Sequence, residues 1–433
     1  MGRYTFLVFF AFAFILLDYY AYQGLKSIIT SGRSVRVFSY TYMAFSVVAY
    51  TAAAYLIFAM YHGVTPVRTM IFNLSSGFLF TMFVSKLVFA GLLLLQDGGR
   101  SLVGIYNWIK SMISPTEILV DGAENSFLPD RRSFLTSSAA LIASFPFIGM
   151  LYGITKGKYK YTVEKITLYY EDLPSKFDGF KIVQISDIHA GSFDDAARVA
   201  EGIQLVNDCK PDLFCFTGDL VNSEKEEIEP YISVFSKIEA KLGKLAVLGN
   251  HDYYGDYDKN DANAEKAYFD DFYRKFDQMG FDLLKNEART ITIEDQSIHI
   301  IGVENWGAGR WFPKKGDLDL ATRTTPGNGF NVLLSHDPTH WEEKVLSYRK
   351  KMHLTLSGHT HGFQFGIKIP GFKWSPAQYR YKHWLGLYEE TDRKLYVNRG
   401  FGFLGFPGRV GMWPEVTLIE LKQGKSPNES VSS

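Results

Sequence analysis

Residues 182–189 read IVQISDIH, a short apolar run that ends in a small residue and is followed by Asp187 and His189. The same pattern, strand-like residues followed by side chains that bind metals, recurs at 213–219 (LFCFTGD), 245–252 (LAVLGNHD), 332–337 (VLLSHD) and 354–361 (LTLSGHTH). Apolar runs of four to six residues bounded by turn residues are typical of buried strands. The chain therefore has five predicted strands that each end in potential metal ligands.

Helix-like segments separate the first three of these strands. They cover 194–208, which opens with two acidic residues suited to a helix N-terminus, and 226–241. Strands that alternate with helices predict an α/β sheet, and ligands of such sheets gather at the carboxyl ends of the strands. The small residue before each ligand lets the backbone turn there without crowding a metal.

A single His or Asp at a strand end is weak evidence, because most are core or turn residues. Five clusters in one chain would require five separate coincidences, which favours a metal site. The other histidines, His62, His299, His340, His353 and His383, are expected to be structural.

The order Asp-x-His, Gly-Asp, Gly-Asn-His-Asp, His, Gly-His-x-His resembles the calcineurin-like metallophosphoesterase superfamily over residues 180–421. The resemblance implies a four-layer α/β/β/α sandwich with two divalent metals between the sheets. It assigns Asp187, His189 and His361 to the first metal and Asn250, His336 and His359 to the second, with Asp219 bridging both.

Imidazole, carboxylate and amide ligands together suit Mn, Fe or Zn, of which we expect Mn. Two such metals can activate a shared water and hold a phosphoryl group, so the expected nucleophile is a metal-bridging hydroxide. The resemblance implies that His251 contacts the phosphoryl group and protonates the leaving oxygen. Asp252 either orients the His251 imidazole or is a helix N-cap, and the sequence leaves both open.

The N-terminal part of the chain has the composition of a membrane protein. Lys+Arg and Asp+Glu are balanced at 46 each, but residues 1–96 hold six bases and one acid. Apolar stretches near 4–22, 37–67, 69–96 and 133–155 are each long enough to cross a bilayer. The first could instead be a signal peptide, and residues 102–113 an interfacial helix or a soluble connector. Asp18 and Lys86 lie near predicted span ends, where they can reach the headgroups.

The fourth stretch follows DRRSFLT (130–136), which resembles the core of a twin-arginine export signal. Because three spans precede it, two arginines that flank a transmembrane helix on its cytoplasmic side are the favoured interpretation. These features are similar to the membrane-attached bacterial subgroup of the superfamily. We expect a transmembrane region at 1–155, a catalytic domain at 156–425 and a disordered tail at 426–433. Seven bases on one side of the spans against five on the other predict a multi-pass plasma-membrane protein with its catalytic domain on the extracytoplasmic face.

The resulting hypothesis is a membrane-bound, metal-dependent phosphoric ester hydrolase. Its expected partners are the lipid bilayer and a phosphate mono- or diester, such as an envelope lipid or a cell-wall precursor. The alternative is a membrane sensor that binds a phosphorylated ligand without turnover. No basic stripe accompanies the site, so no nucleic-acid partner is expected. The aromatic and basic segment 363–384 follows His361 directly and is either a membrane contact or an ordinary hairpin.

Overall fold

The computed structural model describes residues 3–29, 31–61, 70–113, 127–310 and 312–427. The chain forms two compact units, Met1–Tyr152 and Gly153–Ser433. Most of the expected tail and the segment 62–69, at the junction of the second and third expected spans, lie outside the described residues.

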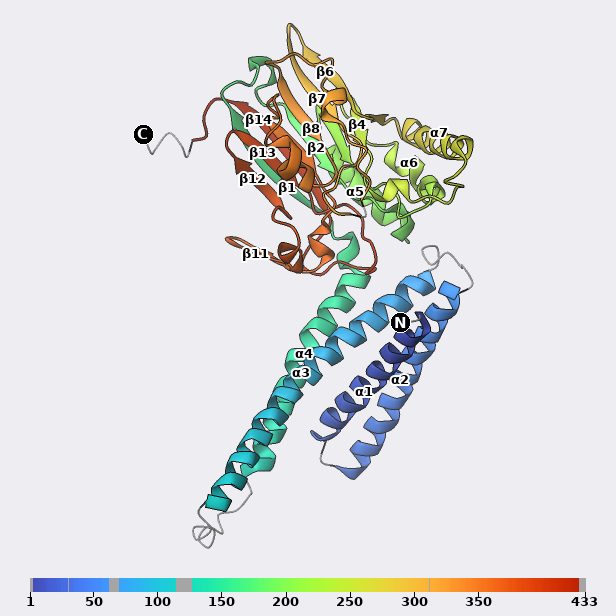
Figure 1. Cartoon of the computed structure of the whole chain (residues 1–433), viewed down its shortest axis with the longest axis vertical. Helices are drawn as coiled ribbons and strands as arrows, with labels where there is room; N and C mark the ends of the chain where they lie inside the picture. Colours follow the sequence, from blue (N-terminus) through green and yellow to red (C-terminus); the bar gives the residue numbers. More distant parts are fainter. Residues whose placement is uncertain (1–2, 30, 62–69, 114–126, 311, 428–433) are drawn as a thin grey trace. The chain divides into compact units, whose positions relative to one another are not determined.

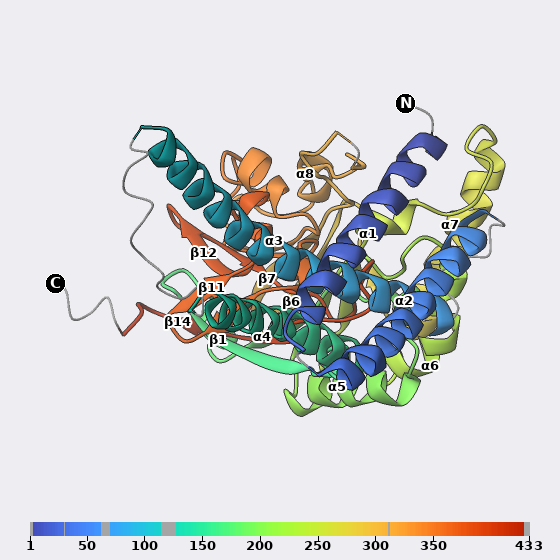
Figure 2. The ribbon, with the colours of Figure 1, turned by 90° about the horizontal axis from the view of Figure 1, so that it is seen from below.

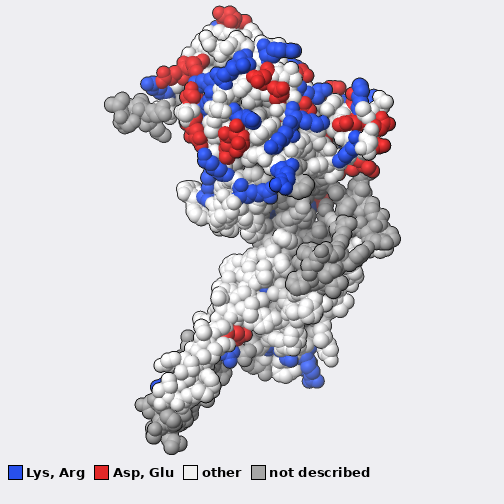
Figure 3. Space-filling view, viewed as in Figure 1, with Lys and Arg blue, Asp and Glu red and all other residues white. Residues whose placement is uncertain are grey.

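The first unit consists of long helices, α1 (Arg3–Lys26), α2 (Gly32–Tyr61), α3 (Met70–Ile113) and most of α4 (Phe127–Thr155). Among the described residues, three helical stretches are long and apolar enough to cross a membrane, namely Gly32–Phe58, Ile71–Ile113 and Ser133–Thr155. Residues 102–113, expected as a separate connector or interfacial helix, continue α3 without a break. On the face shown in Figure 3, the described part of the first unit carries few charges, whereas bases and acids are both spread over the second unit.

Asp18 of α1 and Lys86 of α3 are both buried and form an ion pair. The Asp18 carboxylate also accepts hydrogen bonds from Tyr42 (2.7 Å), Ser46 (2.8 Å) and Tyr50 (2.8 Å), all on α2. The expectation that Asp18 and Lys86 extend separately toward headgroups is therefore wrong. The pair is retained in an apolar unit because each charge has a partner and the carboxylate is fully hydrogen-bonded.

The second unit contains two six-stranded sheets packed face to face (Figure 1). The first has the order β1 (Thr162–Tyr170), β14 (Glu415–Gln423), β2 (Lys181–Ile185), β3 (Leu213–Thr217), β4 (Lys244–Val247) and β5 (Asp282–Leu283). The second has the order β12 (Gly386–Glu390), β13 (Arg393–Val397), β9 (Leu354–Ser357), β8 (Phe330–Leu334), β7 (Gln296–Gly302) and β6 (Glu287–Ile293).

Three apolar cores separate four layers. One lies between the sheets, where Ile182 and Leu213 meet Val332 and Leu354. A second lies between the first sheet and helices α5 (Ala196–Asp208), α6 (Ile232–Phe235) and α7 (Ala262–Met279). The third lies on the outer face of the second sheet, under α8 (Leu318–Ala321) and a turn at Trp341–Val345. Figure 2 shows α8 and α5 on opposite sides of the sheets. The expected α/β/β/α sandwich is confirmed.

The helix expected at 226–241 is shorter than the sequence suggested. A 3-10 segment runs from Lys225 to Tyr231, and α6 adds only Ile232–Phe235. Pro230 lies within the 3-10 segment and has no N–H to donate, which disfavours a regular α-helix there.

The strand pairing brings the five clusters together. Strands β2, β3 and β4 are parallel to one another, as are β7, β8 and β9. The carboxyl ends of parallel strands meet at one edge of a sheet, so the residues that follow β2, β3 and β4 converge, as do those that follow β8 and β9.

Candidate metal centre

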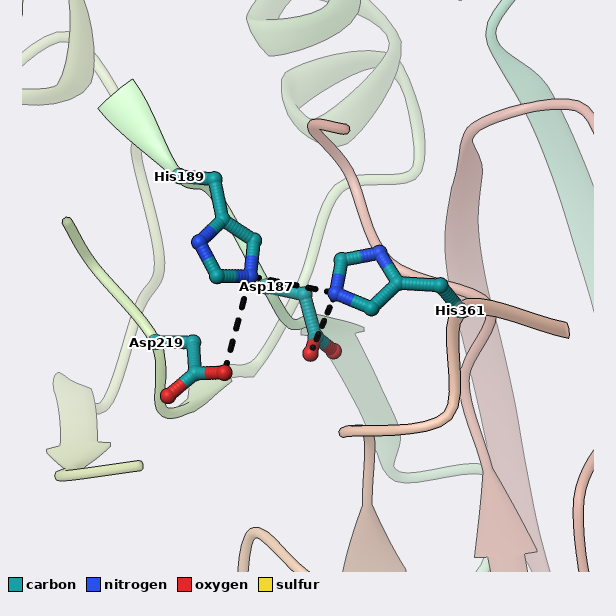
Figure 4. A group of neighbouring side chains, drawn as sticks. All are labelled: Asp187, His189, Asp219 and His361. Carbon is teal, nitrogen blue, oxygen red and sulfur yellow. Dashed lines mark hydrogen bonds and ion pairs between the residues drawn. The ribbon is translucent and has the colours of Figure 1, made fainter. Parts of the chain in front are cut away.

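Four side chains form a first set of metal donors, shown in Figure 4. They are Asp187, His189, Asp219 and His361, and one donor atom from each lies within 4.8 Å of the others. His361 Nε2 is 3.1 Å from His189 Nε2 and 3.2 Å from Asp187 Oδ1. His189 Nε2 is 3.5 Å from Asp219 Oδ2. The donor atoms therefore converge on one point, as the ligands of a single cation do.

A second set shares Asp219 with the first. His336 Nε2 lies 3.1 Å from Asp219 Oδ2 and 3.3 Å from His359 Nδ1. The other oxygen, Asp219 Oδ1, accepts the backbone N–H of His251 at 2.8 Å. Because Oδ2 faces both groups of imidazoles, this oxygen is placed as a bridging ligand would be.

Hydrogen bonds fix which ring nitrogen of two histidines is available to a metal. His336 Nδ1 lies 2.7 Å from the Thr217 carbonyl oxygen, so Nδ1 carries a proton and Nε2 is the nitrogen directed to a metal. His359 Nε2 is 3.1 Å from the Tyr381 hydroxyl and 3.5 Å from Asp337 Oδ2, which leaves Nδ1 for the metal. Partners of this kind orient metal ligands in proteins.

Five of the seven candidate ligands have a left-handed backbone. Asp187, His189, Asp219, His359 and His361 have φ between 48° and 70°. Residues other than glycine rarely adopt this backbone conformation, and each instance costs on the order of 1–3 kcal/mol. Strain repeated at five residues of one site indicates that the surrounding fold is built to hold these donors in place.

The small residues before the ligands prove necessary for steric reasons. A Cβ atom on Gly249 would lie 2.2 Å from Asp219 Oδ1, and one on Gly358 would lie 2.2 Å from Asp187 Oδ2. Both positions therefore admit only glycine without displacing a carboxylate of the site.

The protonation preferences of the buried groups mostly match those of metal ligands. Burial would raise the pKa of Asp187 and of Asp219, but the neighbouring imidazoles hold both pKa values well below the ordinary range. Burial lowers the pKa of His189 and of His359, which favours neutral rings. Although burial opposes it, Asp219 raises the pKa of His336 to about 10, so this ring must lose a proton before it can bind a cation.

Asn250 supplies an independent observation in favour of a metal. Its Oδ1 atom is buried and accepts no hydrogen bond within the described part of the chain, while its Nδ2 points to the Tyr254 hydroxyl at 3.4 Å. A buried amide oxygen without a donor is costly. A bound cation would satisfy this oxygen, and the family resemblance implies that Asn250 belongs to the second metal. The two donor sets and this orphaned oxygen therefore fit divalent cations.

His251 and Asp252 do not interact in the way the sequence suggested. His251 Nδ1 lies 2.7 Å from the Asn222 carbonyl oxygen, which orients the ring and leaves Nε2 free. Its ring packs edge to face against the His189 ring, 4.9 Å between centroids. The histidine is thus adjacent to the first donor set without being part of it.

The buried Asp252 carboxylate accepts four backbone N–H groups, those of Asp219, Leu220, Val221 and Gly249. It is therefore neither the partner of the His251 imidazole nor the N-cap of a helix. It fixes the loop that presents Asp219, because a carboxylate with two oxygens can accept several converging N–H groups at once.

Three further side chains next to the donors had no role assigned from the sequence, namely Tyr381, Asp337 and Arg409. Arg409 is fully buried, its Nη2 lies 3.3 Å from His361 Nδ1, and it donates to the carbonyl oxygens of Arg399 (2.8 Å) and Gly402 (2.8 Å). Asp337 follows His336 directly in the sequence, so its proximity to the metal ligands could have been predicted. Arg409 lies in a glycine-rich loop 48 residues from His361, and no local pattern pointed to it.

Comparison with known proteins supports this geometry. A family model described as calcineurin-like phosphoesterase matches residues 180–363, and one described as a probable calcineurin-like phosphoesterase transmembrane domain matches residues 2–158. A metallophosphoesterase of Bacillus subtilis, YkuE, is 30% identical over 67% of this chain and 97% of its own length.

The chain belongs to the calcineurin-like phosphoesterase family. Phosphodiesterase YaeI of Escherichia coli is 25% identical over 67% of this phosphoesterase and 98% of its own length. A zebrafish (Danio rerio) transmembrane protein with a metallophosphoesterase domain is 28% identical, and the match spans 63% of this chain and 60% of the zebrafish protein. Together with the apolar helices, these matches identify a phosphoesterase domain attached to a transmembrane region.

Proposed function

We propose that this calcineurin-like phosphoesterase is a hydrolase of phosphate mono- or diesters that uses two divalent cations, Mn first and Fe or Zn as alternatives. The observation that carries the proposal is the position of Asp219 Oδ2, which faces His189 of one donor set and His336 of the other. Two cations held there would lower the pKa of a water molecule and neutralise charge on a phosphoryl group.

The residues around the two donor sets have separate tasks in such a reaction. Asp187 and Asp219 provide the negative charge that binds cations, whereas Asn250 provides a neutral oxygen and so limits repulsion of an incoming phosphate. His251 keeps its Nε2 free because Asn222 holds its Nδ1. This orientation supports a role in which Nε2 donates a hydrogen bond to the ester and a proton to the departing oxygen.

The membrane helices support a substrate from the cell envelope. We propose a lipid or a cell-wall precursor that carries a phosphate ester, with the catalytic unit on the extracytoplasmic face of the plasma membrane. A phosphatase reporter fused after Lys160 should be active, and a fluorescent cytoplasmic reporter fused after Arg36 should glow. The opposite pattern would place the catalytic unit in the cytoplasm.

The enzymatic proposal is tested with the purified full-length chain in detergent. Bis-p-nitrophenyl phosphate and p-nitrophenyl phosphate should be hydrolysed after addition of Mn²⁺, and a chelator should abolish the activity. Asp219→Asn should lose both turnover and bound metal, whereas the control Asp258→Asn, at an exposed aspartate, should keep both. An intact chain that binds metal and phosphate but hydrolyses neither ester would favour the sensor alternative.

A further inference from the structure

A small hairpin of the catalytic unit has an exposed apolar face. Strands β10 (Ile367–Ile369) and β11 (Phe372–Trp374) pair with Ile367 opposite Trp374 and Ile369 opposite Phe372. Directly paired residues lie on the same face of an antiparallel ribbon, so these four side chains share one face. Ile367, Ile369 and Phe372 are 50%, 57% and 53% exposed.

The opposite face of the hairpin is basic and is directed toward the domain. Lys368 forms an ion pair with Glu164 of β1 at 2.6 Å, and Lys373 donates to the Leu385 carbonyl oxygen at 2.8 Å. Strands at the surface of a water-soluble domain normally turn their apolar face inward. The inverted orientation leaves apolar surface without a partner inside the domain.

The surroundings of the hairpin have the composition of a membrane interface. Residues 362–388 contain four bases and neither Asp nor Glu. Among the described residues of 153–433, five of the nine large apolar side chains that are exposed lie between Phe363 and Tyr379. Apolar and aromatic residues next to bases favour an anionic lipid surface, and the family's transmembrane region keeps a bilayer close to the chain.

The hairpin is connected to the metal centre through short contacts. Ser375, at its base, donates to the carbonyl oxygen of Gly362, the residue after His361, at 2.7 Å. The ring of Phe363 packs edge to face against Tyr381, whose hydroxyl lies 3.1 Å from His359 Nε2. A surface that held the hairpin would therefore also lie close to the candidate ligands.

We propose that the β10–β11 hairpin inserts its apolar face into the bilayer and that the substrate is a phosphate ester carried by a membrane lipid. This inference rests on the proposed hydrolase function and narrows the substrate from a lipid or a cell-wall precursor to a lipid. Arg380, exposed in the same acid-free segment, would contact anionic headgroups, whereas the exposed Lys382 forms an ion pair with Glu390 at 2.8 Å. The hairpin then holds the catalytic site at the level of the lipid phosphates.

Insertion is tested directly with the full-length chain in nanodiscs that contain anionic phosphatidylglycerol. A thiol-reactive, environment-sensitive fluorophore is attached at Phe372→Cys, and quenching by lipids spin-labelled near the headgroup is measured. The two native cysteines are buried and serve poorly as labelling sites. Quenching should exceed by about threefold that of the control label at Leu320→Cys, a 46%-exposed position on α8. Equal quenching at both positions, or protection of the label by a second copy of the chain, would overturn the proposal.

Turnover distinguishes failure of the inference from failure of the proposed function. The double variant Ile369→Glu/Phe372→Glu should hydrolyse bis-p-nitrophenyl phosphate as the parent does. It should lose about tenfold or more of the activity toward phosphatidic acid or phosphatidylglycerol in nanodiscs, because charged residues oppose insertion. Leu320→Glu should leave both activities unchanged. If the parent cleaves the soluble ester but neither lipid, the lipid class is wrong, whereas a parent that cleaves no ester contradicts the hydrolase function itself.

Discussion

Replacing Asp252 by Asn tests whether this carboxylate serves the loop or the reaction. In the structure its Oδ2 accepts the N–H groups of Gly249 (2.8 Å) and Asp219 (3.0 Å), and its Oδ1 accepts those of Leu220 (2.8 Å) and Val221 (3.3 Å). The amide of Asn keeps one oxygen and places an NH₂ group where the other was. Two buried N–H groups then lose their acceptor and face another donor.

The magnitude follows from those two groups. A buried polar group left without a partner costs about 1–3 kcal/mol, so Asp252→Asn should destabilise the catalytic unit by about 2–6 kcal/mol. A domain of this size loses roughly 2–4 °C of Tm per kcal/mol. The melting temperature should therefore fall by about 4–24 °C. Bound Mn²⁺ should decrease because Asp219 lies in the loop that Asp252 holds.

The assay is thermal unfolding of the full-length chain in detergent, followed by tryptophan fluorescence, with metal content and turnover measured on the same samples. Asp258→Asn is the control, since that carboxylate is exposed. A variant that melts within about 2 °C of the parent yet has a much lower kcat would refute this reasoning. Such a result would show that Asp252 acts in the reaction and not in holding the loop.

Three further substitutions probe other parts of the catalytic unit. Gly358→Ala should lower bound metal and turnover by at least about 10²-fold, because its Cβ would meet Asp187 Oδ2 at 2.2 Å; metal analysis and the aryl ester assay check this. The buried carboxylate of Glu415 forms an ion pair with Arg399 at 2.5 Å. Burial raises the pKa of Glu415 but Arg399 holds it below its ordinary value of 4.5, so the ion pair stabilises the fold above pH 4.5 and loses this effect as the pH falls through the lowered pKa. Glu415→Gln should lower the free energy of unfolding by about 3–5 kcal/mol at neutral pH. Melting curves should show that the difference in melting temperature between variant and parent narrows on acidification. A difference that stays constant with pH would contradict the charge argument. His251→Gln should reduce kcat about 10²–10⁴-fold for alkyl esters and far less for nitrophenyl esters, with metal content unchanged, because a nitrophenolate needs no proton to depart.

The fold and the convergence of the donors could be predicted because each depends on local pattern. An apolar run such as 213–217 identifies a buried strand, and parallel pairing then brings Asp219 and its counterparts to one edge. The two donor sets with one shared carboxylate came from family resemblance, since spacing alone does not assign ligands to particular metals.

The environment of the donors could not be predicted because it depends on residues distant in sequence. The left-handed backbone of His359 and His361 is imposed by packing, and neither side chain favours it. Tyr381 reaches His359 from 22 residues away. Asp252 is next to His251 in the sequence, but adjacent side chains point in different directions. Its carboxylate accepts backbone N–H groups of the loop at 219–221.

The Asp18–Lys86 pair has a consequence for the order in which the chain is made. The two residues are 68 positions apart, so the ribosome releases the acid long before its basic partner exists. An aspartate buried among apolar helices without a partner is costly. The hydroxyls of Tyr42, Ser46 and Tyr50, which follow Asp18 by only 24 to 32 residues, can hydrogen-bond the carboxylate in the interval. Helix α2 therefore offers Asp18 hydrogen-bond donors that lie closer to it in sequence than Lys86 does.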